Sequence, residues 1–312
     1  MAGLIPMELF DLETFVVVVR EHSFSRAATK LHRTQPAVSQ AVRRLEEAIG
    51  EPLLDRSSRD GILTDAGRVL HEYAEKLLNL RDEAKQSITD LKEMNQGRLI
   101  LAANEFTSHY LLRALHEFRK VVPMIKITVQ RSLGSRVPDE VLGHAVELGI
   151  ISYLPMDPLL KTIAVYRDEL AFVVYPSHPL AKAGSVSIRQ LGAESFVAHN
   201  VPSPFRAKVL QAFAKHKTPL HMNVELPTLD AIKGFVKLGN GVALIPAIAC
   251  EAELTRGELV SVDVRELRME RKLRLVYRKN AALSHAARAF LKVAETLAKE
   301  RGERYLFAPE GH

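Results

Sequence analysis

The 312-residue chain contains a single cysteine, Cys250, and this scarcity excludes several classes of protein. One cysteine cannot form an intramolecular disulfide or supply a multi-cysteine zinc site. Its apolar neighbours indicate a small buried side chain, and a redox switch would normally need a second, resolving cysteine. No apolar run approaches the about 20 residues that a helix needs to cross a bilayer. The first 15 residues lack a basic segment followed by an apolar one, so we expect no secretory signal, no membrane association and a cytoplasmic protein.

Motifs of the common enzyme classes are also missing. There is no Walker loop and no GxGxxG, and the histidines His178, His199, His216 and His221 lack the HExxH spacing. The sequence therefore predicts no catalytic residues, no metal site and no cofactor.

The composition is that of a folded protein, with 47% hydrophobic and 26% charged residues, and the length favours two or more domains. The net charge of +6 is concentrated: residues 20–44 hold six basic residues and one acidic residue, whereas the wider segment 1–67 holds eight basic and ten acidic residues. A local basic cluster indicates nucleic-acid binding, and a solvated helix face is the alternative interpretation.

The amino-terminal third of the chain has the pattern of short helices. Residues 7–20 place apolar side chains three and four apart, which predicts an amphipathic helix. Ser25 is a suitable N-cap for a short second helix over 26–31, and Thr34 for a third helix that ends at Gly50 and buries one apolar face. Two short helices joined by a tight turn predict a helix-turn-helix.

A β-hairpin and a long helix are predicted next. Residues 52–64 predict two short strands around the polar turn 56–61, a wing. From Thr64 the pattern of a helix continues without proline to about Met94, roughly 45 Å at 1.5 Å per residue. A coiled-coil seam between two chains explains its apolar spacing, and packing on its own domain is the alternative. The seam residues are Leu70, Tyr73, Leu77, Leu80, Ala84 and Leu91.

After Gly97 strands alternate with helices, which predicts parallel sheets covered on both faces, in two α/β subdomains. The last strand and helix, 273–277 and 284–299, are expected to complete the first subdomain. The other strands are expected at 99–103, 125–129, 147–152, 170–175, 196–198, 222–226 and 242–245, and the other helices at 108–121, 138–144, 204–216 and 229–238.

Four segments carry a resemblance to a known family. Residues 24–50 (FSRAATKLHRTQPAVSQAVRRLEEAIG) resemble the DNA-binding signature of LysR-type transcriptional regulators, and 52–59 (PLLDRSSR) with 63–67 (LTDAG) resemble that family's wing and linker helix. Residues 239–246 (GNGVALIP) are similar to a motif of its effector domain. The resemblance spans nearly the whole chain.

The fold that the resemblance implies is α/β. It comprises an N-terminal winged helix-turn-helix at 1–64, a long dimerisation helix at 65–96 and a two-lobed, periplasmic-binding-protein-like effector domain at 97–312. Lobe I is expected at about 97–167 and 270–305, and lobe II at about 168–269.

In this family the third helix enters the major groove of DNA, where glutamine reads adenine and arginine grips guanine or phosphate. Gln40 departs from the arginine that is more frequent there, and Arg43 is a phosphate contact or a solvated side chain. The residues that match the family's DNA contacts are Arg33, Thr34, Gln35, Pro36, Ala37, Ser39, Gln40 and Arg43, with Arg56 and Arg59 in the wing.

The effector of such a regulator lies between the lobes, near strand ends and helix N-termini. Glu105 stands where relatives often have Ser or Thr; its charge favours an amphoteric or hydroxylated metabolite over a dianion, unless it merely caps a helix. His199 is a ligand contact or a structural hydrogen-bonding residue. The predicted effector-binding residues are Asn104, Glu105, Phe106, Thr107, Ser108, His199, Asn200, Ser203 and Thr228, beside Leu133 and Gly134.

The resemblance therefore implies a transcriptional regulator that responds to a small polar metabolite and binds double-stranded promoter DNA as a homodimer or homotetramer, in reach of RNA polymerase. It is not expected to be an enzyme. The alternative is a two-lobed small-molecule-binding protein or enzyme whose helix-turn-helix serves protein contacts.

Overall fold

The computed structural model describes residues 7–55, 62–92, 97–201 and 203–310. These residues fold as two compact units. The first contains the amino-terminal helices up to Lys92, and the second contains nearly all of the chain that follows. Within the described ranges no helix is long and apolar enough to cross a membrane.

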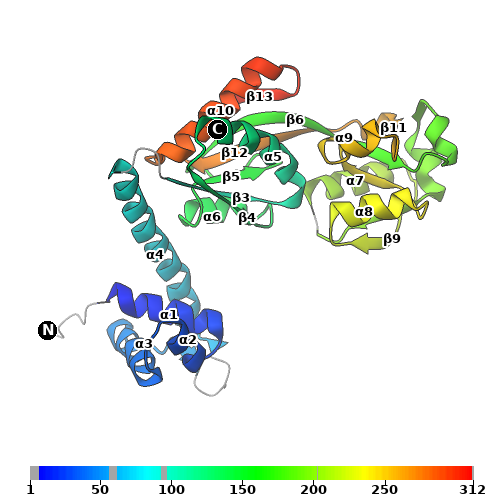
Figure 1. Cartoon of the computed structure of the whole chain (residues 1–312). Coiled ribbons are helices and arrows are strands. Elements are labelled where there is room, and N and C mark those ends of the chain that lie inside the picture. Colours follow the sequence, from blue (N-terminus) through cyan, green and yellow to red (C-terminus); the bar gives the residue numbers. More distant parts are fainter. Residues whose placement is uncertain (1–6, 56–61, 93–96, 202, 311–312) are drawn as a thin grey trace. The chain divides into compact units, whose positions relative to one another are not determined.

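The first unit is a winged helix-turn-helix followed by a long helix (Figure 1). Its elements are α1 (Leu9–Glu21), α2 (Phe24–Lys30), α3 (Gln35–Ile49), the antiparallel strands β1 (Leu54–Asp55) and β2 (Ile62–Leu63), and α4 (Asp65–Lys92). The turn of the predicted wing, with Arg56 and Arg59, lies outside the described residues. Apolar side chains from α1, α2 and α3 form one buried core that includes Leu12, Phe15, Val38, Val42 and Leu45.

The helix caps confirm part of the sequence analysis and correct part of it. Thr34 caps α3 by accepting the backbone N–H of Ala37 at 3.4 Å, and Gly50 ends α3 with a φ of 82° that suits glycine. The prediction of Ser25 as the cap of α2 was wrong, because Ser23 accepts the N–H of Arg26 and the helix begins earlier. Ile49, in the last turn of α3, is 40% exposed, so the apolar face of the helix is not buried to its end.

Close contacts explain why the LTDAG segment joins the wing to α4. The Thr64 hydroxyl donates to the carbonyl of Pro52 at 2.7 Å and accepts the N–H of Gly67 at 2.9 Å, so that it caps the new helix. A Cβ at Gly67 would lie 2.0 Å from the carbonyl oxygen of Leu53. Only glycine allows the two backbones to approach so closely.

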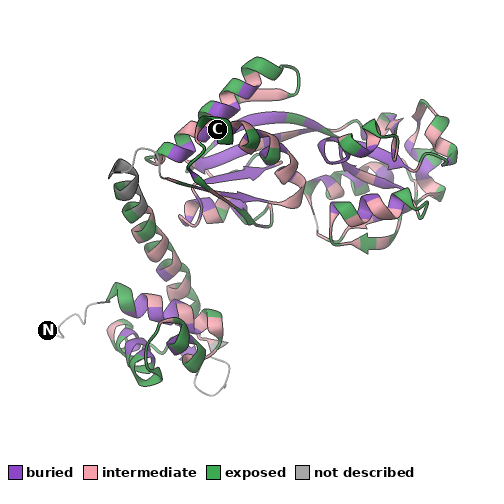
Figure 2. Ribbon diagram, viewed as in Figure 1, coloured by how far each residue is buried: buried purple, intermediate pink, exposed green. Residues whose placement is uncertain are grey.

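The helix α4 has two apolar faces. One face packs on its own unit, with Ala74 buried and Leu70 and Leu78 partly buried against the core, so that Leu70, expected in the seam, also contacts its own unit. The other face is free in a single chain (Figure 2). Its apolar side chains are 40% to 60% exposed: Val69, Tyr73, Leu77, Leu80 and Ile88. The side chain of Leu91 lies outside the described residues.

The second unit contains two lobes built on one large sheet, in the order β4-β3-β5-β12-β6-β11-β7, with β10 and β13 also paired to β6. The strands are β3 (Arg98–Ala103), β4 (Lys126–Arg131), β5 (Leu148–Ile151), β6 (Leu160–Val174), β7 (Ser185–Val186), β8 (Ser195–His199), β9 (His221–Leu226), β10 (Ala243–Pro246), β11 (Val260–Val264), β12 (Glu270–Arg278) and β13 (Tyr305–Glu310). The strands β8 and β9 form a separate parallel pair.

Helices cover these strands. They are α5 (Glu105–Val121), α6 (Val137–Leu142), α7 (Pro204–Lys215), α8 (Leu229–Lys237), α9 (Ala247–Thr255) and α10 (His285–Arg301), with 3-10 turns at Pro179–Lys182, Ile188–Ala193 and Arg265–Leu267. We call lobe I the part with β3, β4, β5, α5, α6 and α10, and lobe II the part with β8 to β11 and α7 to α9.

The chain crosses between the lobes twice, through β6 and β12 (Figure 1). These two strands lie side by side and antiparallel, from Leu160 opposite Arg278 to Glu169 opposite Glu270. The prediction of purely parallel sheets was therefore wrong: β3 is parallel to β4 and β5, but every partner of β6 is antiparallel to it. A chain that leaves a lobe and returns beside its own path must reverse direction.

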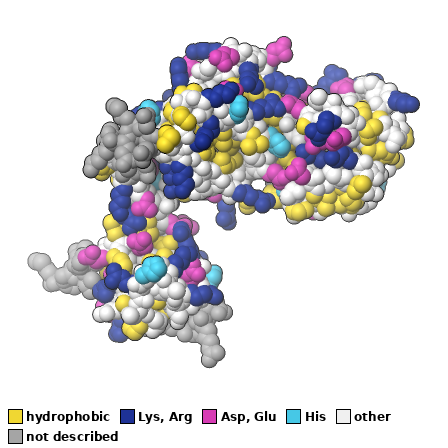
Figure 3. Space-filling view, viewed as in Figure 1, with side chains coloured by type: hydrophobic (Ala, Val, Ile, Leu, Met, Phe, Trp, Pro, Cys, Tyr) yellow, Lys and Arg dark blue, Asp and Glu magenta, His cyan; other side chains and the backbone are white. Residues whose placement is uncertain are grey.

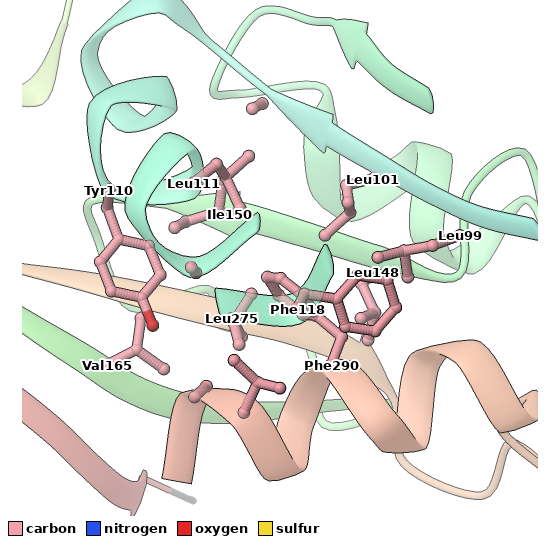
Figure 4. Close-up of a cluster of buried hydrophobic side chains, with 14 of the residues drawn as sticks. Leu99, Leu101, Tyr110, Leu111, Phe118, Leu148, Ile150, Val165, Leu275 and Phe290 are labelled. Atoms are coloured by element: carbon pink, nitrogen blue, oxygen red, sulfur yellow. The ribbon is translucent and has the colours of Figure 1, made fainter. Parts of the chain in front are cut away.

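Each lobe has its own core. In lobe I, side chains from α5, α10 and the sheet form the cluster of Figure 4, in which Tyr110, Phe118, Leu148 and Phe290 are fully buried. Lobe II has two clusters, one around Ile232 and Val236 of α8 and the other around Phe213 of α7. Two separately packed cores joined by two strands make a two-lobed α/β fold, as predicted.

Candidate functional site

The exposed face of α3 carries most of the predicted DNA-contacting residues. The opposite face is buried through Val38, Ala41, Val42 and Leu45. This pattern turns the other side chains outward at the helix N-terminus, where backbone N–H groups are unpaired and attract phosphate. The exposed residues are Thr34, Gln35, Pro36, Ala37, Ser39, Gln40 and Arg43.

Two arginines near this face have partners in the structure. Arg43 Nε donates to Glu47 Oε1 at 3.2 Å, an exposed i,i+4 pair that a phosphate can replace at little cost. Arg33 is exposed and lies over the ring of Phe10, with 5.4 Å from its guanidinium carbon to the ring centroid. Lysine and arginine side chains lie on the visible face of this unit in Figure 3. Amide groups beside cations are the chemistry of DNA recognition.

A cavity of about 650 Å³ lies between the lobes. Lobe I contributes Asn104, Glu105 and Phe106 at the start of α5 and residues 131–135 after β4. Lobe II contributes His199 and residues 203–206 at the start of α7. Two helix N-termini and two strand ends therefore meet at one cavity whose other walls are mostly apolar, an arrangement that suits a small ligand with a polar or charged group.

The predicted effector residues divide into three groups. Asn104, Glu105, Phe106, His199 and Ser203 line the cavity, together with Leu133 and Gly134. Ser108 and Thr228 instead line a smaller hollow of about 300 Å³ that shares Asn104 and Glu105.

Thr107 and Asn200 line neither cavity. Thr107 is fully buried and belongs to a capping box that closes the first turn of α5: Asn104 Oδ1 accepts the N–H of Thr107, and the Thr107 hydroxyl oxygen accepts the N–H of Asn104. Asn200 is exposed beyond the end of β8. Ser203 and Thr228 act as N-caps, since they accept the N–H groups of Arg206 and Ala231.

Both oxygens of the Glu105 carboxylate are engaged. Oε1 accepts the backbone N–H of Leu229 at 2.7 Å, and Oε2 lies 3.1 Å from His199 Nε2. His199 Nδ1 accepts the N–H of Val201 at 3.0 Å, so the ring proton is on Nε2 and is donated to Glu105. Donors of lobe II therefore face both oxygens of Glu105, and the effect of its charge on the class of effector stays a prediction. His199 has a structural hydrogen bond and also lines the cavity.

Sequence reasoning missed three arginines of the cavity: Arg131, Arg206 and Arg271. Within the part of the chain that the structure describes, Arg131 is exposed and has no ion-pair partner. Arg206 donates to the carbonyl of His199 at 3.0 Å and pairs with Glu225. The sequence offers one signal for two of them: Arg131 stands at the end of a strand and Arg206 in the first turn of a helix, the positions at which the other effector residues were predicted.

Arg271 lines the cavity from β12, one of the two strands that connect the lobes. It is 2% exposed and pairs with the buried Asp168, whose other oxygen accepts the N–H of Ile248 at 3.2 Å. Arg271 Nη2 donates to the carbonyl oxygen of Phe106 at 3.1 Å. Burial lowers the pKa of Arg271 from its ordinary value, and the neighbouring Asp168 carboxylate opposes that shift. The pair ties β6, β12, α5 and α9 together at one point.

Two family models match the chain. Residues 9–68 match the bacterial regulatory helix-turn-helix protein of the lysR family, and residues 92–298 match the LysR substrate binding domain. The chain belongs to the LysR family. A probable RuBisCO transcriptional regulator of Synechocystis sp. is 33% identical over 295 residues, which cover 92% of this chain and 86% of the relative.

Solved structures share the fold of this LysR-family chain. Full-length CbnR complexed with its target DNA aligns with a TM-score of 0.71 at 18% identity, over 93% of this chain and 99% of that chain. The regulatory domain of Synechocystis PCC6803 CcmR in complex with 2-PG aligns with a TM-score of 0.60 at 24% identity, over 66% of this chain and 99% of that one. The protein is thus a LysR-type, effector-responsive transcriptional regulator that binds DNA.

Proposed function

We propose that this LysR-type regulator reads promoter DNA with the exposed face of α3, assembles through the free face of α4, and responds to a small anionic metabolite bound between its lobes. It acts in the cytoplasm, where promoter DNA and RNA polymerase meet. The observation that carries the effector part is the set of three arginines around a cavity whose carboxylate, Glu105, is already paired.

The DNA-reading part is supported by a capped helix whose outer face presents two amides, Gln35 and Gln40, and a weakly paired Arg43. The test is an anisotropy titration of the full chain with the upstream region of its own gene, against competitor DNA. Gln35→Ala should remove discrimination of one base pair, worth about 1–3 kcal/mol. Arg43→Ala should weaken all sequences alike and reduce the salt slope by about one phosphate contact.

Gln211→Ala is the matched control, because Gln211 is an exposed glutamine on α7 of lobe II. It should bind DNA as the wild type does. Unchanged operator affinity and base preference in Gln35→Ala would contradict the placement of α3 in the groove. Retained protein–protein contacts with no DNA binding at all would favour the alternative reading of the helix-turn-helix.

The anionic class of the effector follows from charge. Arg131, Arg206 and Arg271 face the cavity with the N-termini of α5 and α7, and positive groups at helix starts favour carboxylates and phosphates. The first probe is 2-PG, because a domain of the same fold is solved with it. A ligand of the folded state raises the unfolding temperature with concentration.

Arg131→Gln is the informative variant because Arg131 has no ion pair to lose among the described residues. It should unfold at the wild-type temperature without ligand and lose most of the stabilisation by anions. Arg119→Gln, an exposed arginine on α5 away from the cavity, is the control. Stabilisation by an uncharged polyol or an amine, with none by mono- or dianions, would overturn the anionic class while leaving the DNA-binding proposal intact.

The assembly part rests on the five apolar side chains of α4 that a single chain leaves exposed. Along this helix of 28 residues they are spaced four, four, three and eight residues apart, which keeps them on one face as a seam that a second copy covers. A homodimer is the smallest assembly that buries it, and a tetramer requires further contacts of the second unit.

A further inference from the structure

The boundary between the lobes is lined on α5 by a polar stripe, formed by Glu105, His109 and Arg113 at spacings of one helical turn. Such residues lie on one face of the helix. Glu105 accepts from His199 Nε2 at 3.1 Å and from the N–H of Leu229 at 2.7 Å, at the start of α8. The ring of His199 also lies 4.9 Å from the ring of Phe106, between centroids.

Two turns further along, Arg113 forms an ion pair with Glu251 of α9. Both side chains are about one-third exposed, so water reaches this contact. Between the two contacts, burial and the nearby Lys233 of α8 lower the pKa of His109, which keeps its ring neutral. One helix of lobe I therefore holds lobe II through two charged contacts, and both partners belong to elements far away in the sequence.

We propose that Glu105 and Arg113 form a latch that holds the two lobes in this arrangement. The contacts suit a reversible latch because both are polar: water reaches Arg113 and Glu251 directly, and Glu105 is partly exposed and faces the cavity, although its partner His199 is largely buried. The buried Asp168–Arg271 pair below them stays closed and serves as the fixed point about which β6 and β12 bend.

The latch also offers a route from ligand to lobe motion. Glu105 and His199 line the cavity. A bound anion that accepts a hydrogen bond from His199 Nε2 therefore competes with Glu105 for that donor. A ligand shifts a conformational equilibrium only by such differential contacts. This signalling role rests on the proposed function, whereas the latch itself does not.

The latch is tested in the full chain by the distance between spin labels on the two lobes. Labels are attached at Arg119→Cys on α5 and Gln211→Cys on α7, both exposed positions. The native Cys250 is buried, and burial raises the pKa of its thiol to about 12, so it stays unlabelled. Dilution with excess unlabelled chain removes distances between copies.

In the labelled protein, Glu105→Ala should broaden and shift the distance distribution, and addition of Arg113→Ala should shift it further. Glu117→Ala is the matched control on the same helix, because Glu117 pairs with Lys120 and Arg301, both within lobe I. It should leave the distribution unchanged. Glu105→Gln keeps the volume and the acceptor for Leu229, so it should fold normally and give an intermediate shift.

An unchanged distribution in both Glu105→Gln and the Glu105→Ala/Arg113→Ala double variant, with wild-type unfolding temperatures, would overturn the latch. The signalling arm adds 2-PG and inorganic phosphate separately to the labelled wild type. If neither moves the lobes while the latch variants do, the latch stands and the proposed anionic effector fails. If the anions shift the distances and the variants do not, the effector stands and the latch fails.

Discussion

The free face of α4 and the boundary between the lobes are opposite in chemistry. The first presents five apolar side chains that are 40% to 60% exposed in one chain. The second is held mainly by carboxylates, a histidine, arginines and backbone N–H groups, beside apolar contacts in which Phe106 packs against the core of lobe II and Ile248 belongs to the core of lobe I. An apolar stripe left in water is unfavourable and needs a lasting cover, whereas polar groups exchange one partner for water at small net cost. The difference supports the two proposals, a lasting assembly at α4 and a lobe boundary that opens.

The largest expected effect concerns the buried Asp168–Arg271 pair at the lobe boundary. Asp168→Ala leaves Arg271, 2% exposed, as an unpaired buried charge, so we expect a loss of about 3–5 kcal/mol in the free energy of unfolding. Urea unfolding of the full chain measures it. Glu225→Ala, which removes the exposed partner of Arg206 in lobe II, should cost under about 1 kcal/mol. Equal losses would contradict the expectation that the buried pair contributes far more to stability than an exposed pair within one lobe.

The second effect concerns the apolar surface. Leu77→Glu places a charge in the middle of the α4 stripe, where a partner chain would bury it. The monomer should fold normally because Leu77 is exposed there, but self-association should weaken by about a hundredfold or more, equivalent to about 3 kcal/mol. Sedimentation velocity over a concentration series measures this. Leu210→Glu on α7, a leucine of similar exposure, is the control. An oligomer that survives Leu77→Glu would place the interface elsewhere.

The sequence predicts the first unit better than the lobe boundary, and the reason is the distance along the chain over which each feature is encoded. Thr34, Pro36 and Gly50 act on the helix in which they lie, so their pattern is readable locally. The bond from Leu229 to Glu105 joins residues 124 positions apart, and the Arg271–Asp168 pair joins residues 103 apart. No local pattern reports such a pairing.

Missed and misplaced site residues have the same origin. Thr107 and Ser108 were expected in the cleft; α5 begins at Glu105 and uses both hydroxyls in its first turn, so that Thr107 is buried whereas Ser108 lines the smaller hollow. The strand β6 was recognised only in its second half, because Arg167, Asp168 and Glu169 interrupt its apolar pattern. Two of these three charges are explained by partners on β12, which the sequence could not reveal.

The smallest expected effect concerns Glu258, whose exposed ion pairs belong neither to the free face of α4 nor to the lobe boundary. Arg256 and Lys237 lower the pKa of Glu258 from 4.5 to about 2. A carboxylate with a depressed pKa in the folded state contributes stability above its unfolded pKa and loses it as pH falls from about 4.5 towards 2. Glu258→Gln should therefore flatten the fall in urea midpoint below pH 4.5, and Arg256→Gln should do so partially by raising that pKa. Because the pair is solvent-exposed, the urea midpoint at pH 7 should change only slightly. A midpoint that falls more steeply below pH 4.5 in either variant would show that the pair does not stabilise the folded state. Label distances separate this exposed pair from the latch: Glu105→Gln should change them, whereas Glu258→Gln should leave them unchanged.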